Sequence, residues 1–424
     1  MIRHQQTTSE LPREVRRGRI GVLATFFIVG FVMAAWFVNI PAVQARAQIS
    51  HSTLGVLLLI LGLGAVISMQ IAGILISRYG SRTVAFVAVA AAVITINLPA
   101  STSSALSLGV ALFVFGLGNG AAEVAMNAQA VLVEKKYARP IMSAFHAMWS
   151  IGGAAGALLG AAAQALDLDV RISVLAAAVI AGGLAAIFLR RLLPGDRTDQ
   201  ADTETIAPIQ QPAPPAGRMR LRILAFGALA FLMLLVEGVA NDWGPLHAVE
   251  RLHRSEATAS LAFGTFAVAM TVGRLTIDRV AERIGPRAVV RYGSFVAAVG
   301  IGVVIVSPVY PLTLAGWTIY GLGLAGIVPQ VFTAAGNLPS DRSSVVLARV
   351  VGAGYVGVLA GPALIGFAAS RFGLDHAFLL PLLFCLVGVA LASTLAPKPS
   401  KFTAQPRAGT ASKAARSSAS TSID

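Results

Sequence analysis

The feature that most constrains the fold of this chain is a series of about twelve apolar segments separated by short polar breaks. Most of them are close to the roughly 20 residues that a helix needs to cross a bilayer. The composition, 56% apolar and 12% charged, excludes an ordinary soluble protein, in which about 25% of residues are charged. The sequence therefore predicts an all-α polytopic membrane protein with twelve transmembrane helices.

The basic residues predict how these helices are oriented. If alternate connections lie on alternate sides, 28 of the 33 Lys and Arg residues fall on one side and 5 on the other. The richer side is expected to face the cytoplasm. The net charge of +14 then reflects topology and contact with anionic lipid, and we expect no nucleic-acid partner. This predicts a multi-pass protein of the cell inner membrane with both termini cytoplasmic.

Composition also divides the chain into two halves. A stretch with five prolines and four acidic residues, and without an apolar run, separates the sixth and seventh apolar segments and is typical of a flexible linker. The end of the chain is rich in Ser, Ala and Thr, which is typical of disorder. The predicted organisation is a cytoplasmic N-terminal segment (1–19), a six-helix bundle (20–193), a cytoplasmic linker (194–219), a second six-helix bundle (220–396) and a disordered cytoplasmic tail (397–424).

Two acidic residues lie well inside apolar stretches, Glu123 and Glu237. A carboxyl group at membrane depth is costly and usually faces the bundle interior or a watery cavity, so each is a candidate functional residue. Since desolvation disfavours the charged form, these acids are the proton-coupling candidates. The alternative is that each is a neutral, hydrogen-bonded contact between helices.

Polar residues near Glu123 suggest a solute site. Asn119, Glu123 and Asn127 are spaced by four and share one helix face, which should point into a cavity. His146 and Trp149 lie on one face of the next segment, and an aromatic plane beside hydrogen-bonding groups suits a sugar. His146 is equally compatible with packing.

The second half offers further substrate-binding candidates. Asn241 follows Glu237 by one turn, and the tenth segment contains Trp317 and Gln330. None of these residues is specific by itself.

A glycine- and arginine-containing loop follows the second apolar segment of each half. The copies are Gly73-Ile-Leu-Ile-Ser-Arg-Tyr-Gly-Ser-Arg82 and Gly273-Arg-Leu-Thr-Ile-Asp-Arg-Val-Ala-Glu-Arg-Ile-Gly-Pro-Arg287. They resemble the loop G-x-L-A-D-R-x-G-R-K of the major facilitator superfamily. Gly73, Arg78, Gly80 and Arg82 fit that loop, with Ser77 in place of its usual Asp, whereas the second copy keeps Gly273, Arg274, Asp278 and Arg279.

This resemblance covers nearly the whole chain and implies two pseudo-symmetric six-helix bundles. In the family, the loop aspartate takes part in a charge network that latches the halves on the cytoplasmic side. The stretches Gly116-Leu-Gly-Asn-Gly-Ala-Ala-Glu-Val-Ala-Met-Asn-Ala-Gln129 and Ser143-Ala-Phe-His-Ala-Met-Trp-Ser-Ile-Gly-Gly153 look similar to the YbjJ-like branch, near the fucose-permease type of sugar:proton symporters.

The sequence lacks the motifs that are typical of several enzyme and metal-binding chemistries. The sequence has no G-x-x-x-x-G-K-[ST] phosphate loop, no cysteine-histidine metal spacing and no Gly-x-Ser-x-Gly. We therefore expect no enzyme activity, cofactor or bound metal, but a monomeric secondary transporter that moves a small polar solute with protons by alternating access. Two alternatives stay open: an exporter of drugs or metabolites by proton antiport, and a transporter-like receptor that binds solute and signals.

Overall fold

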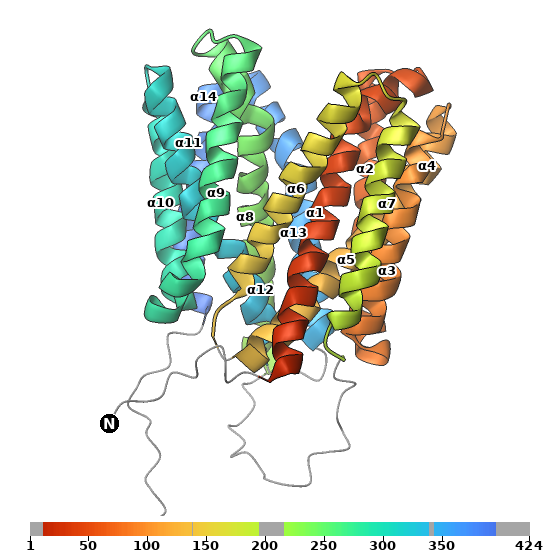
Figure 1. The fold of residues 1–424 in the computed structure, drawn as a ribbon. Helices are drawn as coiled ribbons and strands as arrows, with labels where there is room; N and C mark the ends of the chain where they lie inside the picture. The colour runs from red at the N-terminus through yellow and green to blue at the C-terminus, as the bar shows by residue number, and fades with distance from the viewer. Residues whose placement is uncertain (1–11, 138, 195–215, 339–342, 396–424) are drawn as a thin grey trace, which may run out of the picture.

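The computed structural model describes residues 12–137, 139–194, 216–338 and 343–395, which form helices and contain no strand (Figure 1). The elements are α1 (Arg13–Ala47), α2 (His51–Tyr79), α3 (Ser81–Thr95), α4 (Asn97–Ala100), α5 (Ala105–Tyr137), α6 (Met142–Ala165), α7 (Val170–Phe188), η1 (Leu189–Arg191), α8 (Ala216–Glu250), α9 (Glu256–Ile284), α10 (Pro286–Val306), α11 (Tyr310–Leu324), α12 (Ile327–Gly336), α13 (Ser343–Phe372), α14 (Leu374–Ala377), α15 (Leu379–Leu391) and η2 (Ala392–Thr394).

Several short elements continue one another, so the described part of the chain crosses the bundle twelve times. The joined spans are Ser81–Ala100, Val170–Arg191, Tyr310–Gly336 and Leu374–Thr394. Eleven helices are long and apolar enough to cross a membrane. The twelfth, α6, has 24 residues and packs along α1. The predicted all-α fold with twelve transmembrane helices is confirmed.

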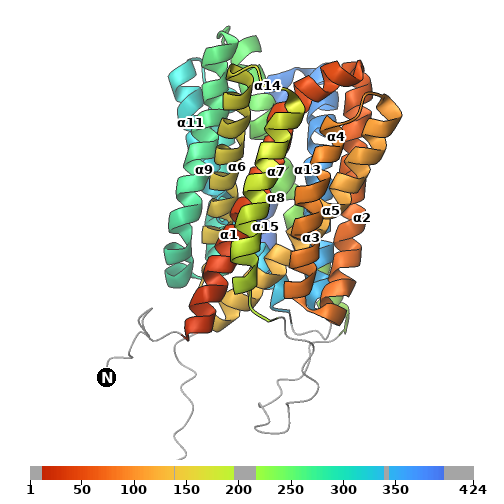
Figure 2. The same cartoon turned by 45° about the vertical axis from the view of Figure 1, so that its right-hand side comes forward.

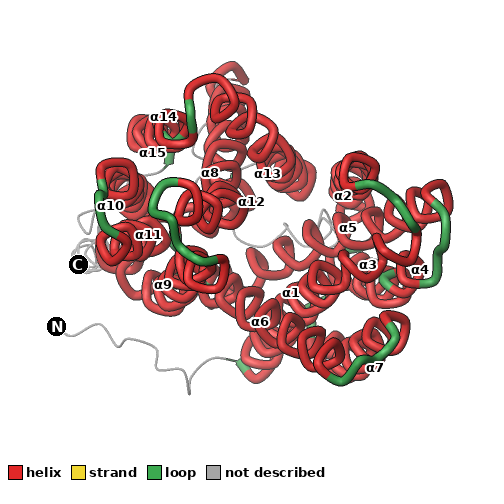
Figure 3. The backbone as a smooth tube through the Cα atoms, turned by 90° about the horizontal axis from the view of Figure 1, so that it is seen from above, coloured by secondary structure: helices red, strands yellow, loops and turns green. Residues whose placement is uncertain are grey.

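The twelve spans form two groups (Figure 3). In the first, α1 packs on α6 and α2 on α5, and in the second, α8 packs on α13 and α9 on α11. The groups meet along α2 with α13 and along α6 with α9. The bulk of each predicted six-helix bundle is thus described, whereas most of the predicted linker, all of the predicted tail and residues 1–11 lie outside the described residues.

The repeated loop forms the same turn in both halves. Gly80 joins α2 to α3 with φ +82°, and Gly285 joins α9 to α10 with φ +87°. A side chain is strongly disfavoured at such backbone angles, so glycine is the residue that permits the turn. This turn is the structural basis of the repeat seen in the sequence.

Close packing of α6 on α1 fixes the helix that carries His146 and Trp149. A Cβ atom on Gly156 would collide with the backbone carbonyl of Phe31, and one on Gly152 with that of Phe27. Such close approach of small residues is a common basis of helix packing in membranes.

The long helices run between the same two ends of the molecule (Figure 2). We call the end at which α1 begins and α2, α5 and α9 finish the basic end, because it carries Arg13, Arg78, Lys135 and Arg283. It is the lower end in Figure 2.

Candidate functional site

Glu123 lies at mid-helix in α5, where the two halves meet. Its side chain is 7% exposed and interacts with the Trp149 indole of α6 and the Tyr355 hydroxyl of α13, although the indole N–H does not reach hydrogen-bonding geometry. Asn119 donates from Nδ2 to the Tyr355 hydroxyl at 3.3 Å. We call Asn119, Glu123, Trp149 and Tyr355 the Glu123 cluster.

No cationic side chain of the described residues forms an ion pair with Glu123. Its surroundings are aromatic rings and neutral polar groups, and the carbonyl oxygen of Asn119 and the indole N–H of Trp149 have no hydrogen-bond partner. Buried polar groups usually have partners. The unused groups are therefore available to a ligand that enters the cluster.

Asn127 and His146, the other candidates on these two helices, are held within the protein. Asn127 is fully buried and donates from Nδ2 to the backbone carbonyl of Glu123 at 2.9 Å. The His146 ring lies 5.1 Å from the Phe26 ring and 6.0 Å from the Phe332 ring, and its Nε2 has no hydrogen-bond partner. Since Phe332 belongs to the second half, His146 also lies where the halves meet.

Glu237, the second predicted acid, is paired. Its Oε1 accepts a hydrogen bond from Nη2 of Arg274 at 2.9 Å, with side-chain exposures of 18% for Glu237 and 6% for Arg274. Nη1 of Arg274 donates to the Ser150 hydroxyl of α6 at 2.8 Å. Arg274 thus links its own half, through Glu237, to the other half, through Ser150. We call these three residues the Arg274 bridge.

The beginning of α6 is held by carboxylates from both halves. Asp278 of α9 accepts hydrogen bonds from the backbone N–H groups of Ser143 at 3.1 Å and Ala144 at 2.9 Å. Glu134 of α5 accepts from those of Ile141 at 2.8 Å and Met142 at 2.7 Å. Negative groups at a helix N-terminus satisfy free N–H groups and oppose the helix dipole.

Glu134 also reaches the second half, because its Oε1 accepts from the Thr333 hydroxyl of α12 at 2.7 Å. The hydrogen bonds that join the halves in the described residues are therefore found at mid-helix or toward the basic end.

The partners of Asp278 differ from those that the sequence suggested. The hydrogen bonds of its carboxylate run to backbone N–H groups of α6 and not to the neighbouring arginines, because Arg274 turns into the interior and Arg279 is exposed. Asp278 nevertheless joins the two halves.

Asp278→Asn should loosen this contact. Asparagine keeps the shape but offers one acceptor oxygen and no charge, so one N–H of α6 loses its partner, at a cost of about 1 kcal/mol. A cysteine at Ala334, which is half-buried in the wall of a cavity at the same end of the molecule, should then react faster with a thiol reagent, and the native Cys385 is fully buried. Arg279→Gln is the control. Unchanged labelling and transport in Asp278→Asn would reject a gating role.

The first copy of the loop makes a different contact. The Ser344 hydroxyl of α13 donates to the Gly73 carbonyl at 3.1 Å. Arg78 is exposed and lies over the Tyr79 ring, and Arg82 donates to the Arg190 carbonyl of its own half at 3.1 Å. With Ser77 in place of an aspartate, this copy forms no ion pair to the second half among the described residues.

The remaining candidates lie apart from the Glu123 cluster. Asn241 is exposed, one turn beyond Glu237 on α8. Trp317 is fully buried, its ring 5.7 Å from that of Tyr320 and 5.9 Å from that of Phe378. Gln330 lines a cavity at the basic end. Gly273 packs against Ala325 of its own half.

Comparison with known proteins identifies the family. The model of the Major Facilitator Superfamily matches residues 22–253 and 223–422. The chain belongs to the major facilitator superfamily. An uncharacterized MFS-type transporter of Yersinia pestis is 34% identical over 362 residues, which cover 85% of this chain and 91% of that protein. The uncharacterized transporter y4wD of Sinorhizobium fredii is 33% identical over 377 residues, covering 89% and 97%.

The fold matches solved members of the major facilitator superfamily. The fucose:proton symporter FucP of E. coli superimposes with a TM-score of 0.72 at 16% identity, over 88% of this chain and 98% of FucP. The family model and the relatives confirm the resemblance to this superfamily. The chain is a multi-pass membrane transporter and not an enzyme.

Ser150 and Tyr355 are visible in the sequence as polar groups in apolar segments. Glu134 and Thr333 were not among the sequence candidates. Glu134 precedes Lys135 and Lys136, so in the sequence it resembles a solvated helix end.

Proposed function

We propose that this transporter couples the movement of a small polar, sugar-like solute to protons, by symport and alternating access. The observation that carries the proposal is the position of Glu123, buried between the halves without a cationic partner and beside Trp149 and Tyr355.

The proton is assigned to Glu123. An unpaired buried charge costs several kcal/mol, so the neutral acid fits this aromatic and uncharged environment. A conformational change that separates the halves would move Tyr355 away from Glu123 and admit water, which favours loss of the proton. Glu237 is already neutralised by Arg274 and is assigned to positioning Arg274 and the solute.

The solute is assigned to the Glu123 cluster. The Trp149 ring offers a plane for the apolar face of a sugar, and Asn119, with its unused carbonyl oxygen, offers hydrogen bonds to hydroxyl groups. That FucP is a fucose:proton symporter supports this choice. His146, which lies on the same helix as Trp149, is proposed to border the site.

Orientation follows from the basic residues. We place the basic end in the cytoplasm of a cell with this protein in its inner membrane, as the positive-inside rule predicts. The described conformation is then closed toward the cytoplasm, because the hydrogen bonds between the halves lie at mid-helix or toward that end.

Two measurements test the proposal. Purified protein is screened by thermal shift against sugars, organic acids and cationic drugs, because a specific ligand stabilises the folded state. The best ligand is then tested for counterflow and for accumulation driven by a pH gradient in vesicles. A sugar that exchanges and accumulates supports the proposal. Stabilisation by cationic drugs with proton-driven expulsion indicates an exporter, and binding without exchange indicates a receptor.

Trp149→Ala should weaken binding of that ligand by about 1 to 3 kcal/mol, because the stacking plane is lost. Calorimetry on the purified variant measures the affinity, and its melting temperature reports the fold. Trp149→Phe, which keeps an aromatic plane, should retain most of the affinity. If Trp149→Ala melts early and the surviving protein binds normally, Trp149 is a packing residue.

A further inference from the structure

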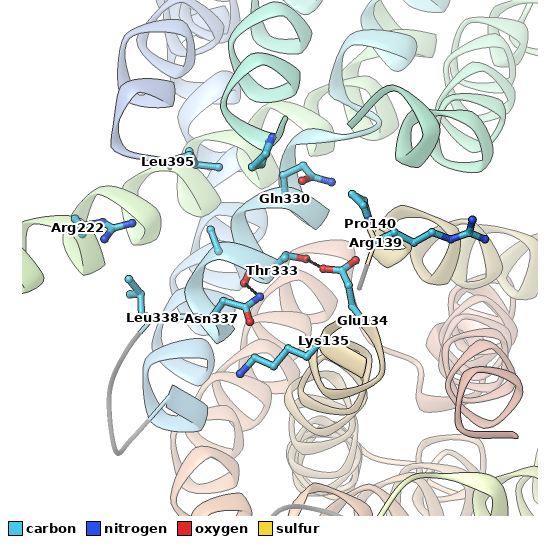
Figure 4. Close-up of a pocket in the computed structure, with 12 residues that line it drawn as sticks. Glu134, Lys135, Arg139, Pro140, Arg222, Gln330, Thr333, Asn337, Leu338 and Leu395 are labelled. Carbon is cyan, nitrogen blue, oxygen red and sulfur yellow. Dashed lines mark hydrogen bonds between the residues drawn. The ribbon is translucent and has the colours of Figure 1, made fainter. Parts of the chain in front are cut away.

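A cavity of about 460 Å³ lies at the basic end, apart from the Glu123 cluster and the Arg274 bridge (Figure 4). Its walls come from both halves: Lys135 from the end of α5, Arg222 from the start of α8, and Gln330 and Asn337 from α12 and the residue after it. We call it the Lys135 cavity. The solute and proton chemistry assigned to the Glu123 cluster uses none of these four residues.

The cavity carries an excess of positive charge. Its one acidic residue, Glu134, is already engaged, because its oxygens accept hydrogen bonds from Ile141, Met142 and Thr333. Neither Lys135 nor Arg222 forms an ion pair with a carboxylate of the described residues. Two cations that share a cavity repel each other, and an anion between them removes that repulsion.

A buried amide provides a second, independent observation. Gln330 is 3% exposed, and its side-chain amide forms no hydrogen bond within the described chain. Its backbone N–H donates a hydrogen bond to the Gly326 carbonyl within the helix. The side-chain amide of Asn337 donates to the Thr333 carbonyl at 2.8 Å. In Figure 4 Gln330 and Asn337 lie on the same wall of the cavity. The Gln330 amide therefore lies at the surface of the cavity with its hydrogen-bonding capacity unused within the described chain, and it can donate to a ligand that enters.

Arg139 is not part of this arrangement. Arg139 borders the cavity, but Figure 4 shows its side chain directed away from Gln330.

We propose that the Lys135 cavity binds a phosphate-bearing anion, with Lys135 and Arg222 paired to phosphate oxygens and the Gln330 amide donating to the same ligand. Phosphate oxygens accept several charge-assisted hydrogen bonds at once, which matches two cations and an amide. The cavity of about 460 Å³ is within the size range of sites for small organic ligands, so it has room for more than the phosphate group. The anion is either a soluble organic phosphate or the headgroup of an anionic lipid at the adjacent membrane surface.

Binding would favour one conformation. Lys135 belongs to the first half, and Arg222 and Gln330 belong to the second. A ligand that contacts all three binds best when the halves are together at the basic end, so it stabilises that state relative to one in which they separate. The ligand would therefore act as an inhibitor of opening at this end.

The test measures binding without transport. Full-length protein in detergent is titrated with glycerol 3-phosphate, with glycerol as the neutral control, and its melting temperature is followed. Protein in nanodiscs of phosphatidylcholine is compared with protein in nanodiscs that also contain phosphatidylglycerol. We expect a saturable rise in melting temperature with glycerol 3-phosphate if the ligand is soluble, or with phosphatidylglycerol if it is a lipid, and no change with glycerol.

Lys135→Gln and Arg222→Gln should each lower the affinity for the probe that stabilises the wild-type protein about tenfold, as expected for loss of a charge-assisted contact. Lys136→Gln is the matched control, since Lys136 is the exposed neighbour that does not line the cavity. Melting temperatures without probe show whether each variant folds, and Gln330→Leu tests the amide separately. The proposal is overturned if neither probe stabilises the wild-type protein, or if Lys136→Gln lowers the affinity for the probe as much as Lys135→Gln does.

Discussion

Glu123→Gln should abolish accumulation of solute against a gradient while retaining exchange of solute across the membrane. Glutamine keeps the shape of the side chain and most of its hydrogen bonds but cannot ionise. If Glu123 carries the coupling proton, the variant stays in the equivalent of the protonated form and equilibrates solute without using the proton gradient. Proteoliposomes with an imposed pH gradient measure accumulation, and counterflow measures exchange.

Two variants make this result interpretable. Glu250→Gln changes an exposed carboxyl group at the end of α8 and should transport normally. Glu237→Gln should mainly weaken solute binding, because Arg274 loses its partner. If both Glu123→Gln and Glu237→Gln still concentrate solute in response to the pH gradient, the two acids are structural contacts and the coupling residue lies elsewhere.

Arg274→Gln should strongly destabilise the protein and abolish transport. Removing one member of a buried ion pair leaves the other charge without compensation, which costs about 3 to 5 kcal/mol. The effect should fall near the lower limit, since Glu237 is 18% exposed. Melting temperature and counterflow on purified protein measure the two effects.

The double variant Arg274→Gln with Glu237→Gln separates stability from function. It removes both charges, so it should recover most of the lost melting temperature. It should not recover transport, because the link from Arg274 to Ser150 is still missing. Arg279→Gln, an exposed arginine on the same helix, is the control. Equal losses in the single and double variants would show that the ion pair is not what stabilises this region.

Glu123 and its neighbours Asn119 and Trp149 could be predicted from the sequence, but the contact with the other half could not. An acidic residue in the middle of an apolar segment is costly to bury in a membrane, so the sequence alone marks it as a candidate functional residue. Its contact Tyr355 belongs to the other half, and Asn119 and Tyr355 are 236 residues apart. No local pattern connects residues at that separation, so the meeting of the halves appears only in the folded chain.

Arg274 lies deeper in the protein than the local sequence pattern suggested. An arginine after an apolar run suggests the end of a transmembrane segment, and the family loop also begins at Gly273. The structure continues α9 to Ile284 and keeps Arg274 inside, because Glu237 on the adjacent helix neutralises its charge. That partner is 37 residues away, which is beyond the range of helix periodicity.

Trp317 and Gln330 illustrate a further limit of predicting helix faces from the sequence. The sequence predicts one helix for the tenth segment, but the structure divides it into α11 and α12 around Ala325 and Gly326. Residues on the two sides of such a break do not keep a common face. Trp317 therefore packs inside the second half, and Gln330 faces a cavity at the basic end.

The position of α6 has a consequence for how substitutions act. Its first turn is held by Asp278 and Glu134, and its residue Trp149 belongs to the Glu123 cluster. Ser143 and Trp149 are six residues apart on one continuous helix, about 9 Å along its axis. We therefore expect any change that rotates α6, including a larger side chain at Gly152 or Gly156, to alter ligand affinity and closure together. Under the proposed assignment, selectivity and turnover rate are not separately adjustable through this helix, and we expect variants chosen for a new solute to have altered gating.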